Sequence, residues 1–310
     1  MPERSIANAP CSWGTLEFAD LSGTRIEYRQ MLDELVATGY TGTELGDWGF
    51  MPTDPSALAA ELQSRTLTLI GAFVPVDLRA DNTTTAPAIA HACRTANLLA
   101  HTAQLLGQTH QPMIILADAN GTDPVRTATA GRITGRTRST DIVKAAKCAT
   151  AAAHAIHAAT GLQSAFHHHC AGIIETPDEV RRFLHHIDAT NLGLVFDTGH
   201  MLYGANDNTC DLVALVHEFS AHIRLVHYKD CSTTVADRIR AMQGDYFAAL
   251  QAGIFCELGQ GAVQFDAVTR ALDAIGYTGW IVVEQDVLPG MGAPRESAAR
   301  NRSYLRSIGL

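Results

Sequence analysis

Short apolar runs alternate with longer amphipathic segments along this chain of 310 residues. The runs are continuously apolar rather than strictly alternating, which is typical of parallel strands that are covered on both faces. They predict eight strands, within residues 5–10, 42–46, 68–75, 112–117, 164–169, 192–197, 223–230 and 279–286. The intervening segments predict helices near 25–38, 56–65, 87–107, 138–160, 177–188, 209–219, 237–252 and 264–276, with a last helix near 295–308.

Eight strands separated by helices predict an α/β protein, a single (β/α)8 TIM barrel domain formed by residues 1–310. An open doubly wound sheet is the alternative, but no GxGxxG follows the first strand. The helix near 177 is well marked, because Thr176 can cap it, Pro177 suits its first turn and Glu179 lies three residues after the cap. The segment 118–141, rich in Gly, Thr and Arg, follows the fourth strand and predicts a long loop over the C-terminal face, where barrel enzymes keep their active sites.

The composition and net charge of the chain indicate which classes of binding partner to expect. Hydrophobic residues make up 46% and charged residues 18% of the chain, a globular balance, and the formal net charge is -9. The densest basic stretch, 132–138, is too short to follow a phosphate backbone, so nucleic acid is an unexpected partner. No apolar run approaches the ~18 residues that span a bilayer, and the N-terminus lacks the pattern of a signal peptide. We therefore expect a cytoplasmic protein without a membrane partner, whose seven cysteines, none in a CxxC pair, are reduced.

Four predicted strands end in the same way, with an apolar pair followed by a side chain that can bind a metal. These side chains are His167, Asp197, His227 and Glu284, separated by 30, 30 and 57 residues, or about one, one and two βα units. Residues at equal heights on the strands of a closed barrel converge on its axis. Any one of them could be an ordinary polar residue at the rim, but four at matching positions favour a divalent metal site, and Mn, Co, Zn and Fe(II) all suit such ligands.

Other polar residues near these strand ends could face the same pocket. His169 lies on the same side of an extended strand as the candidate ligand two residues before it, and Lys229 does so in the VHYKD segment, whereas Asp230 would face the other side. His200 and Glu44 are further candidates. Each of these five could instead hydrogen-bond backbone groups.

Two aromatic residues are candidate pocket walls for a sugar-like ring. They are Trp13, after the first strand, and Trp48, after the second, although ordinary packing at a barrel mouth explains them equally well. We interpret His168 and Glu175 as structural.

The chain also resembles a known family, the xylose isomerase-like TIM barrels of sugar isomerases, epimerases and endonuclease IV-type enzymes. Within it the sequence is most similar to the inosose dehydratases. The matching stretches are 39–78, 167–180, 194–204, 226–231, 258–268 and 276–286. The resemblance implies a divalent metal at the C-terminal face, with Asp197, His227 and Glu284 at ligand positions.

The resemblance also bears on the reaction. Sugar epimerases of the family usually carry a glutamate on the fifth strand and use two facing glutamates as bases, whereas this sequence has His167 there. A dehydratase needs a base for the proton α to a ketone and an acid for the departing hydroxyl. The resemblance thus implies a metal-dependent lyase acting on a cyclic keto-polyol, with Glu284, Lys229 and Glu44 as candidate bases and His200 or His169 as candidate acids. The expected partner is this small molecule, and the chain could form a homo-oligomer.

Three alternatives stay open at this point. A keto-sugar isomerase or epimerase would need a second base opposite Glu284, such as Glu44 or Glu175. An enzyme that eliminates the aglycone of a 3-keto-glycoside would need the 118–141 loop to stand open. A non-catalytic barrel that acts as a partner subunit is the third, although no ligand position is visibly lost.

Overall fold

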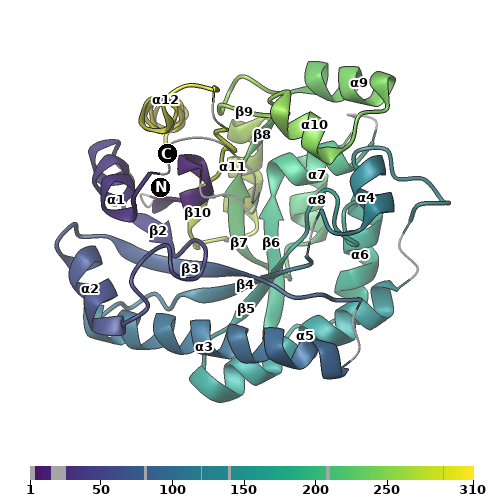
Figure 1. The fold of residues 1–310 in the computed structure, drawn as a ribbon. Helices are drawn as coiled ribbons and strands as arrows, with labels where there is room; N and C mark the ends of the chain where they lie inside the picture. The colour runs from purple at the N-terminus through teal and green to yellow at the C-terminus, as the bar shows by residue number, and fades with distance from the viewer. Residues whose placement is uncertain are drawn as a thin grey trace.

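Eight parallel strands close into a barrel in the order β1-β10-β7-β6-β5-β4-β3-β2, and helices surround it (Figure 1). The computed structural model describes residues 4–14, 26–79, 82–119, 121–138, 141–206, 210–288 and 290–310. The predicted (β/α)8 barrel and all eight of its strands are confirmed. The strands are β1 (Ile6–Asn8), β2 (Gly42–Glu44), β3 (Thr68–Pro75), β4 (Met113–Ala117), β5 (Ser164–His167), β6 (Leu192–Asp197), β7 (Ile223–Tyr228) and β10 (Ile281–Val283).

Most helices lie where the sequence predicts them. They are α1 (Tyr28–Ala37), α2 (Pro55–Gln63), α3 (Asn82–Leu106), α5 (Ile142–Thr160), α6 (Pro177–His186), α8 (Leu212–Glu218), α11 (Phe265–Ala274) and α12 (Pro294–Ser307). Helix α6 begins with the expected capping box, in which the Thr176 hydroxyl accepts the backbone N–H of Glu179 and the Glu179 carboxylate accepts that of Thr176.

One segment that was predicted as a single helix forms two helices in the structure. The segment predicted as a single helix over 237–252 forms α9 (Thr233–Met242) and α10 (Tyr246–Gln251). Gln243 takes a left-handed conformation with φ of 53°, and the Asp245 side chain then accepts the backbone N–H of Ala248 to start the second helix. A left-handed residue followed by a new cap ends one helix and starts another, and neither is visible in the apolar pattern.

Short helices and a small ribbon lie near the C-terminal ends of the barrel strands, and the sequence did not predict them. The 118–141 segment, expected to be a loop, contains α4 (Pro124–Thr129). The short helix η1 (Pro10–Trp13) begins two residues after β1, and α7 (Thr198–Gly204) follows β6 directly. Beyond β7, β8 (Asp230–Cys231) pairs with β9 (Phe255–Cys256) in a small antiparallel ribbon.

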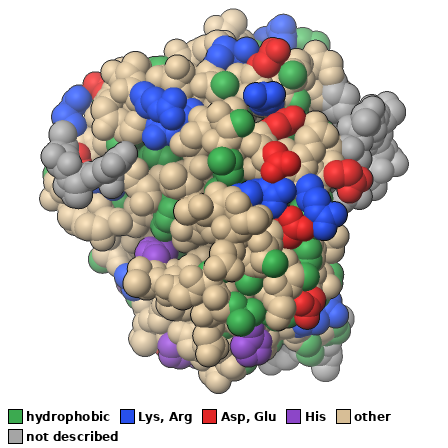
Figure 2. Space-filling model, turned by 90° about the vertical axis from the view of Figure 1, so that its left-hand side faces the viewer, with side chains coloured by type: hydrophobic (Ala, Val, Ile, Leu, Met, Phe, Trp, Pro, Cys, Tyr) green, Lys and Arg blue, Asp and Glu red, His purple; other side chains and the backbone are tan. Residues whose placement is uncertain are grey.

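Charged side chains of both signs can be followed on one face of the molecule. On the face drawn in Figure 2, acidic and basic side chains are interspersed, and the basic ones do not gather into one patch. Within the described ranges, no helix has both the length and the apolar character that crossing a membrane requires.

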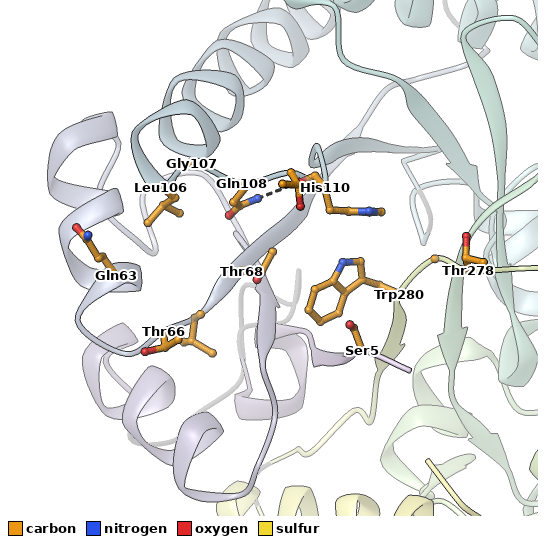
Figure 3. A pocket seen from close by; sticks show the side chains of 13 residues that line it. Ser5, Gln63, Thr66, Thr68, Leu106, Gly107, Gln108, His110, Thr278 and Trp280 are labelled. Carbon is orange, nitrogen blue, oxygen red and sulfur yellow. Dashed lines mark hydrogen bonds between the residues drawn. The ribbon is translucent and has the colours of Figure 1, made fainter. Parts of the chain in front are cut away.

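The barrel interior is a separate apolar core of its own. Inward-facing side chains form a cluster distinct from the larger one between strands and helices, and its members include Ala7, Ile70, Ile115, Ala165, Val195, Leu225, Trp280 and Val282. Trp280 closes this core at the N-terminal end of the strands and lines a cavity of about 630 Å³ there. Figure 3 shows its indole among Thr68, Ser5 and His110. The barrel is therefore plugged at one end.

A glycine makes room for this plug. A Cβ atom on Gly42 of β2 would lie 2.9 Å from Cζ3 of Trp280 and 2.8 Å from Cδ1 of Ile70, closer than carbon atoms tolerate. Both neighbours are buried members of the inner core, so making room for the added carbon would disturb the packing of that core.

We predict that Gly42→Ala lowers the free energy of unfolding by about 1–3 kcal/mol, because an added methyl group overpacks the barrel interior. Urea or thermal unfolding followed by circular dichroism measures the change. Gly135→Ala is the matched control, since a Cβ there meets no atom within 4 Å. Equal stability of the two variants would show that the Trp280 end of the barrel is not tightly packed.

Candidate functional site

The polar residues at the C-terminal end of the barrel continue the inward-facing rows of the apolar core. Because side chains on a strand alternate between its two faces, a residue two positions beyond an inward-facing one also faces inward. His167 follows Ala165 in this way, Asp197 follows Val195, His227 follows Leu225, Glu284 follows Val282, and Glu44 follows Gly42. The closed barrel thus directs five polar side chains toward its axis.

The four predicted ligands meet at short range. His167 Nε2 lies 3.0 Å from His227 Nδ1, and His227 Nδ1 lies 3.1 Å from Glu284 Oε1. Asp197 Oδ2 lies 3.5 Å from the His167 nitrogen and 3.9 Å from the His227 nitrogen. One ligand atom from each residue lies within 4.8 Å of the others, and all four residues are buried. We call these four residues the ligand cluster.

These distances fit a divalent ion. Ligand atoms at about 2.1 Å from one ion can be no more than about 4.2 Å apart. The four quoted separations are within that limit, and the ligand atoms farthest apart, within 4.8 Å of each other, would have to move slightly closer around an ion. The buried Oδ2 atom of Asp197 also accepts no hydrogen bond from the described residues. A buried carboxylate oxygen without a donor is costly, so the cluster is chemically incomplete without a positive partner.

Both imidazoles are held so that the correct nitrogen faces the cluster. His167 Nδ1 lies 2.8 Å from the carbonyl oxygen of His168, so Nδ1 carries the proton and Nε2 is free to coordinate. His227 Nε2 lies 2.9 Å from Oε1 of Glu44, which leaves its Nδ1 for the cluster. Carbonyl and carboxylate partners of this kind orient metal-binding histidines. Glu44, predicted as a base, therefore lies where it holds His227.

Neighbouring charges shift the pKa values of two residues of the ligand cluster in opposite directions. Burial alone would lower the pKa of His227, but the carboxylates of Glu284 and Glu44 outweigh burial and raise this pKa to about 10. Burial would raise the pKa of Glu284, and His227 and Lys229 instead hold it well below its usual value. In the metal-free protein, the proton on His227 thus supplies part of the positive charge that the carboxylates need.

Lys229 is a buried cation beside the cluster. Its Nζ lies 2.9 Å from Glu284 Oε2 and 3.6 Å from Asp286 Oδ2, and it sits 4.9 Å from the centre of the Phe255 ring. Burial would lower the pKa of this amine, but Asp286 and Glu284 raise it well above its usual value. Lys229 suits charge stabilisation rather than the predicted role of a base.

Sequence reasoning missed Asp286. Its carboxylate is buried, and burial raises its pKa. A signal existed, because Asp286 lies two residues beyond Glu284 in the same EQD segment, as His169 lies beyond His167.

Two further histidines adjoin the ligand cluster, as predicted. The His169 ring stacks on that of His167 with centroids 4.0 Å apart, and the His200 ring meets His169 edge-on at 4.7 Å. Burial, together with nearby charge, holds the pKa of both well below the usual value, so both are neutral. The backbone N–H of Cys170 donates to His200 Nδ1 at 3.2 Å, which places the proton of the neutral ring on Nε2. His200 Nε2 lies 3.4 Å from Lys229 Nζ, and because an ammonium cannot accept a hydrogen bond, this is a contact between two donors in the Nε2–H tautomer.

The three remaining predicted substrate contacts have other partners. The carboxylate of Asp230 accepts the backbone N–H groups of Cys231, Gly259, Gly261 and Val263 at 2.8–3.1 Å. The indole N–H of Trp13 donates to Glu34 on α1, and Trp48 packs against His91 and Arg94 of α3. The predicted substrate contacts of Asp230 and Trp13 are not supported, since Asp230 has its oxygens filled by backbone and Trp13 is buried against a helix.

Glu175 and His168, which we interpreted as structural, differ in their hydrogen-bond partners. Glu175 accepts backbone N–H groups from Gly131 and Ala171, as a structural carboxylate does. His168 is fully buried, and neither of its ring nitrogens has a partner among the described residues.

Relatives of known function share nearly the whole length of the chain. It is 28% identical to the inosose dehydratase of Geobacillus thermodenitrificans over 315 residues, covering 96% of this chain and 95% of the relative. It is also 28% identical to the inosose dehydratase of Erwinia tasmaniensis over 305 residues, covering 97% and 96%.

Solved structures share the fold. The 3-keto-D-glucoside 4-epimerase of E. coli superposes with a TM-score of 0.68 at 15% identity, over 98% of this chain and all of that one. The IOLI protein, solved with a zinc atom, gives a TM-score of 0.66 at 16% identity, over 98% and 97%. At such low identity these structures support the barrel alone.

The family model described as "Xylose isomerase-like TIM barrel" matches residues 32–308. The match includes every strand of the barrel except β1 and all four residues of the ligand cluster. The chain therefore belongs to the xylose isomerase-like TIM barrel family.

Proposed function

We propose that this protein is a metal-dependent hydro-lyase that dehydrates a cyclic keto-polyol of the inosose type. The observation that carries the proposal is the buried ligand cluster with an imidazole, His167, on the fifth strand, flanked by the neutral His169 and His200. Proton-donating groups on this side suit the loss of a hydroxyl better than a symmetric pair of carboxylate bases does. The inosose dehydratases that match over nearly full length support the same substrate class.

The metal would be held by His167 Nε2, Asp197 Oδ2, His227 Nδ1 and Glu284 Oε1. A divalent ion supplies Lewis acidity there, which polarises a ketone and makes the neighbouring C–H more acidic. Mixed nitrogen and oxygen ligands suit Mn, Co, Zn and Fe(II).

The protein groups divide the proton transfers between them. Lys229 is a cation and cannot be the base. We assign the base to Glu284, whose Oε1 faces the ligand cluster and whose Oε2 faces Lys229, and we assign Glu44 to holding His227. The lowered pKa of Glu284 keeps its carboxylate ionised. Glu284 takes the proton from the carbon α to the ketone. His200 Nε2–H, or His169, gives a proton to the β-hydroxyl, which departs as water while the carbon–carbon double bond forms. Because the ring is neutral at the start, the ammonium of Lys229, 3.4 Å from His200 Nε2, returns a proton to it as the first one leaves. Lys229 stabilises the negative charge that develops between these groups.

The structure favours this reaction over the two enzyme alternatives. A second base opposite Glu284 is needed for epimerisation, but Glu44 is engaged with His227 and Glu175 with two backbone amides. An open 118–141 loop is needed for a bulky aglycone. The described part of this segment is instead fastened down, with both backbone groups of Ile133 bonded to the Asn206 side chain.

The first test is a reaction with 2-keto-myo-inositol. We predict that metal-stripped protein is inactive and that Mn or Co restores turnover, with a product lighter by one water and a new ultraviolet absorbance. A product of unchanged mass with one inverted stereocentre would overturn the lyase assignment in favour of an epimerase. Stoichiometric metal without turnover on any polyol ketone would support the non-catalytic barrel.

Two variants that should lose metal to different degrees test the ligand cluster. We predict that Asp197→Asn abolishes retention of the metal and turnover together, while its amide oxygen can still cap α7 through the His200 N–H. Glu44→Gln should weaken metal affinity only about 10–100-fold, because it removes the partner of a ligand rather than a ligand. Atomic absorption after dialysis measures both. Full metal retention by Asp197→Asn would contradict the assignment.

Metal binding should also expel a proton. Because the pKa of His227 is about 10 in the metal-free protein, this imidazole is charged at pH 7.5, and a metal must displace the proton on Nδ1. Apparent affinity should therefore rise about tenfold per pH unit from pH 7 to pH 9. Calorimetric titrations with Zn in two buffers of different ionisation enthalpy count the protons. Release of none at pH 7.5 would show that His227 is not a ligand.

A further inference from the structure

The segment that links β5 to α6 carries much of the candidate chemistry. It contains His169, which stacks on a ligand, and Cys170, whose N–H fixes the proton of His200 on Nε2. Its next residue, Ala171, has a φ of 66°, a left-handed conformation that alanine rarely adopts. Such backbone persists only where surrounding contacts hold it.

Arg126 of α4 supplies those contacts from outside the ligand cluster. Its Nε donates to the carbonyl oxygen of Gly172 at 2.7 Å, and its two terminal nitrogens donate to the two carboxylate oxygens of Glu179 at 2.9 and 2.8 Å. A further bond reaches the carbonyl oxygen of Thr137 at 3.0 Å. The Arg126 residue is only 3% exposed, so water does not compete for these bonds.

Two carboxylates extend this contact to the rest of the segment. Glu179 Oε2 accepts the backbone N–H groups of Glu175 and Thr176 at 3.0 and 3.1 Å. Glu175 accepts the N–H of Ala171 at 2.8 Å and that of Gly131 at 2.7 Å. We call Arg126, Glu175 and Glu179 the arginine frame. It ties α4, the 131–137 stretch and the start of α6 to the residues next to Cys170.

A buried ion pair is a poor source of stability, since apolar side chains of similar volume often serve as well. What a buried arginine provides is fixed geometry, because its planar guanidinium holds several oxygen atoms in defined positions at once. Here the oxygens belong to Gly172 and Glu179, on either side of the turn that presents Cys170 to His200.

We propose that Arg126, with Glu175 and Glu179, is a positioning group that sets the orientation of His169 and the tautomer of His200. This inference rests on the proposed dehydration for its effect on rate, but not for its effect on the imidazoles. Arg126 acts through the backbone of residues 170–172 and touches no residue of the ligand cluster. Loss of the frame should therefore slow proton transfer to the leaving hydroxyl and leave the metal in place.

The test compares Arg126→Met, Arg126→Lys and Glu175→Gln with Arg65→Met. Arg65 is the matched control, because its guanidinium also donates to carboxylate oxygens, those of Asp33 and Glu61, but it lies just after α2, far along the barrel wall from β5. Metal content, kcat, KM and the ¹⁵N signals of the histidine ring nitrogens are measured for each. A His200→Gln difference spectrum assigns the signals of His200 among the fourteen histidines.

We expect kcat to fall about 10–100-fold in Arg126→Met with metal content unchanged, since small displacements of catalytic groups cost this much. The ¹⁵N signals of His200 should change from a single Nε2–H tautomer to a mixture. Arg126→Lys should recover part of both, because one ammonium cannot reach Gly172 and both Glu179 oxygens. Arg65→Met should change neither.

Unchanged kcat and unchanged His200 signals in folded, metal-loaded Arg126→Met would overturn the proposal. If that variant does not fold, Arg126→Lys and Glu175→Gln decide by the same two measurements. If the wild-type protein dehydrates no keto-polyol, the proposed function fails, and the His200 signals alone still decide whether the arginine frame positions the imidazole.

Discussion

Carboxylates buried at the mouth of an apolar barrel are costly unless positive charge is buried with them. Glu44, Asp197, Glu284 and Asp286 all lie there, each 8% exposed or less. Lys229 is the permanent cation among them, and it contacts Glu284 and Asp286. Asp197 and Glu44 depend instead on the two imidazoles of the ligand cluster. The raised pKa of His227 and the unsatisfied oxygen of Asp197 are two consequences of the same shortage of positive charge, which a divalent ion would relieve.

The barrel makes this concentration of charge possible by separating two environments along one axis. Toward the N-terminal ends of the strands, the side chains of Trp280 and Ile70 pack over Gly42 and close the interior. One layer above them, small and branched residues such as Ala165 and Val195 fill the interior. Polar side chains enter only in the layer above those, so they are close together and largely shielded from water, where electrostatic interactions are strong.

Outside the axis, backbone contacts decide the protonation of the histidines. A carbonyl oxygen sets the proton of His167 on Nδ1, and an amide sets that of His200 on Nε2. One imidazole is thereby left as an electron-pair donor and the other as a proton donor, although the two are chemically identical residues. The arginine frame matters because it holds the backbone that makes one of these assignments.

The sequence by itself determined the eight strands and the ligand cluster. Continuous apolar runs are a local property, and a repeat of about 30 residues with a period of two inside each strand places His167, Asp197 and His227 at one height on one axis. The same repeat predicts the position of Glu284, about two βα units after His227, and the period of two predicts that of His169. What the sequence did not determine are contacts between segments that no period relates. Glu44 lies 183 residues from His227, Arg126 lies 53 from Glu179, and Trp13 turns to a helix rather than to the pocket. Only the tertiary structure decided these, because they depend on how loops and helices pack around the barrel once it has closed.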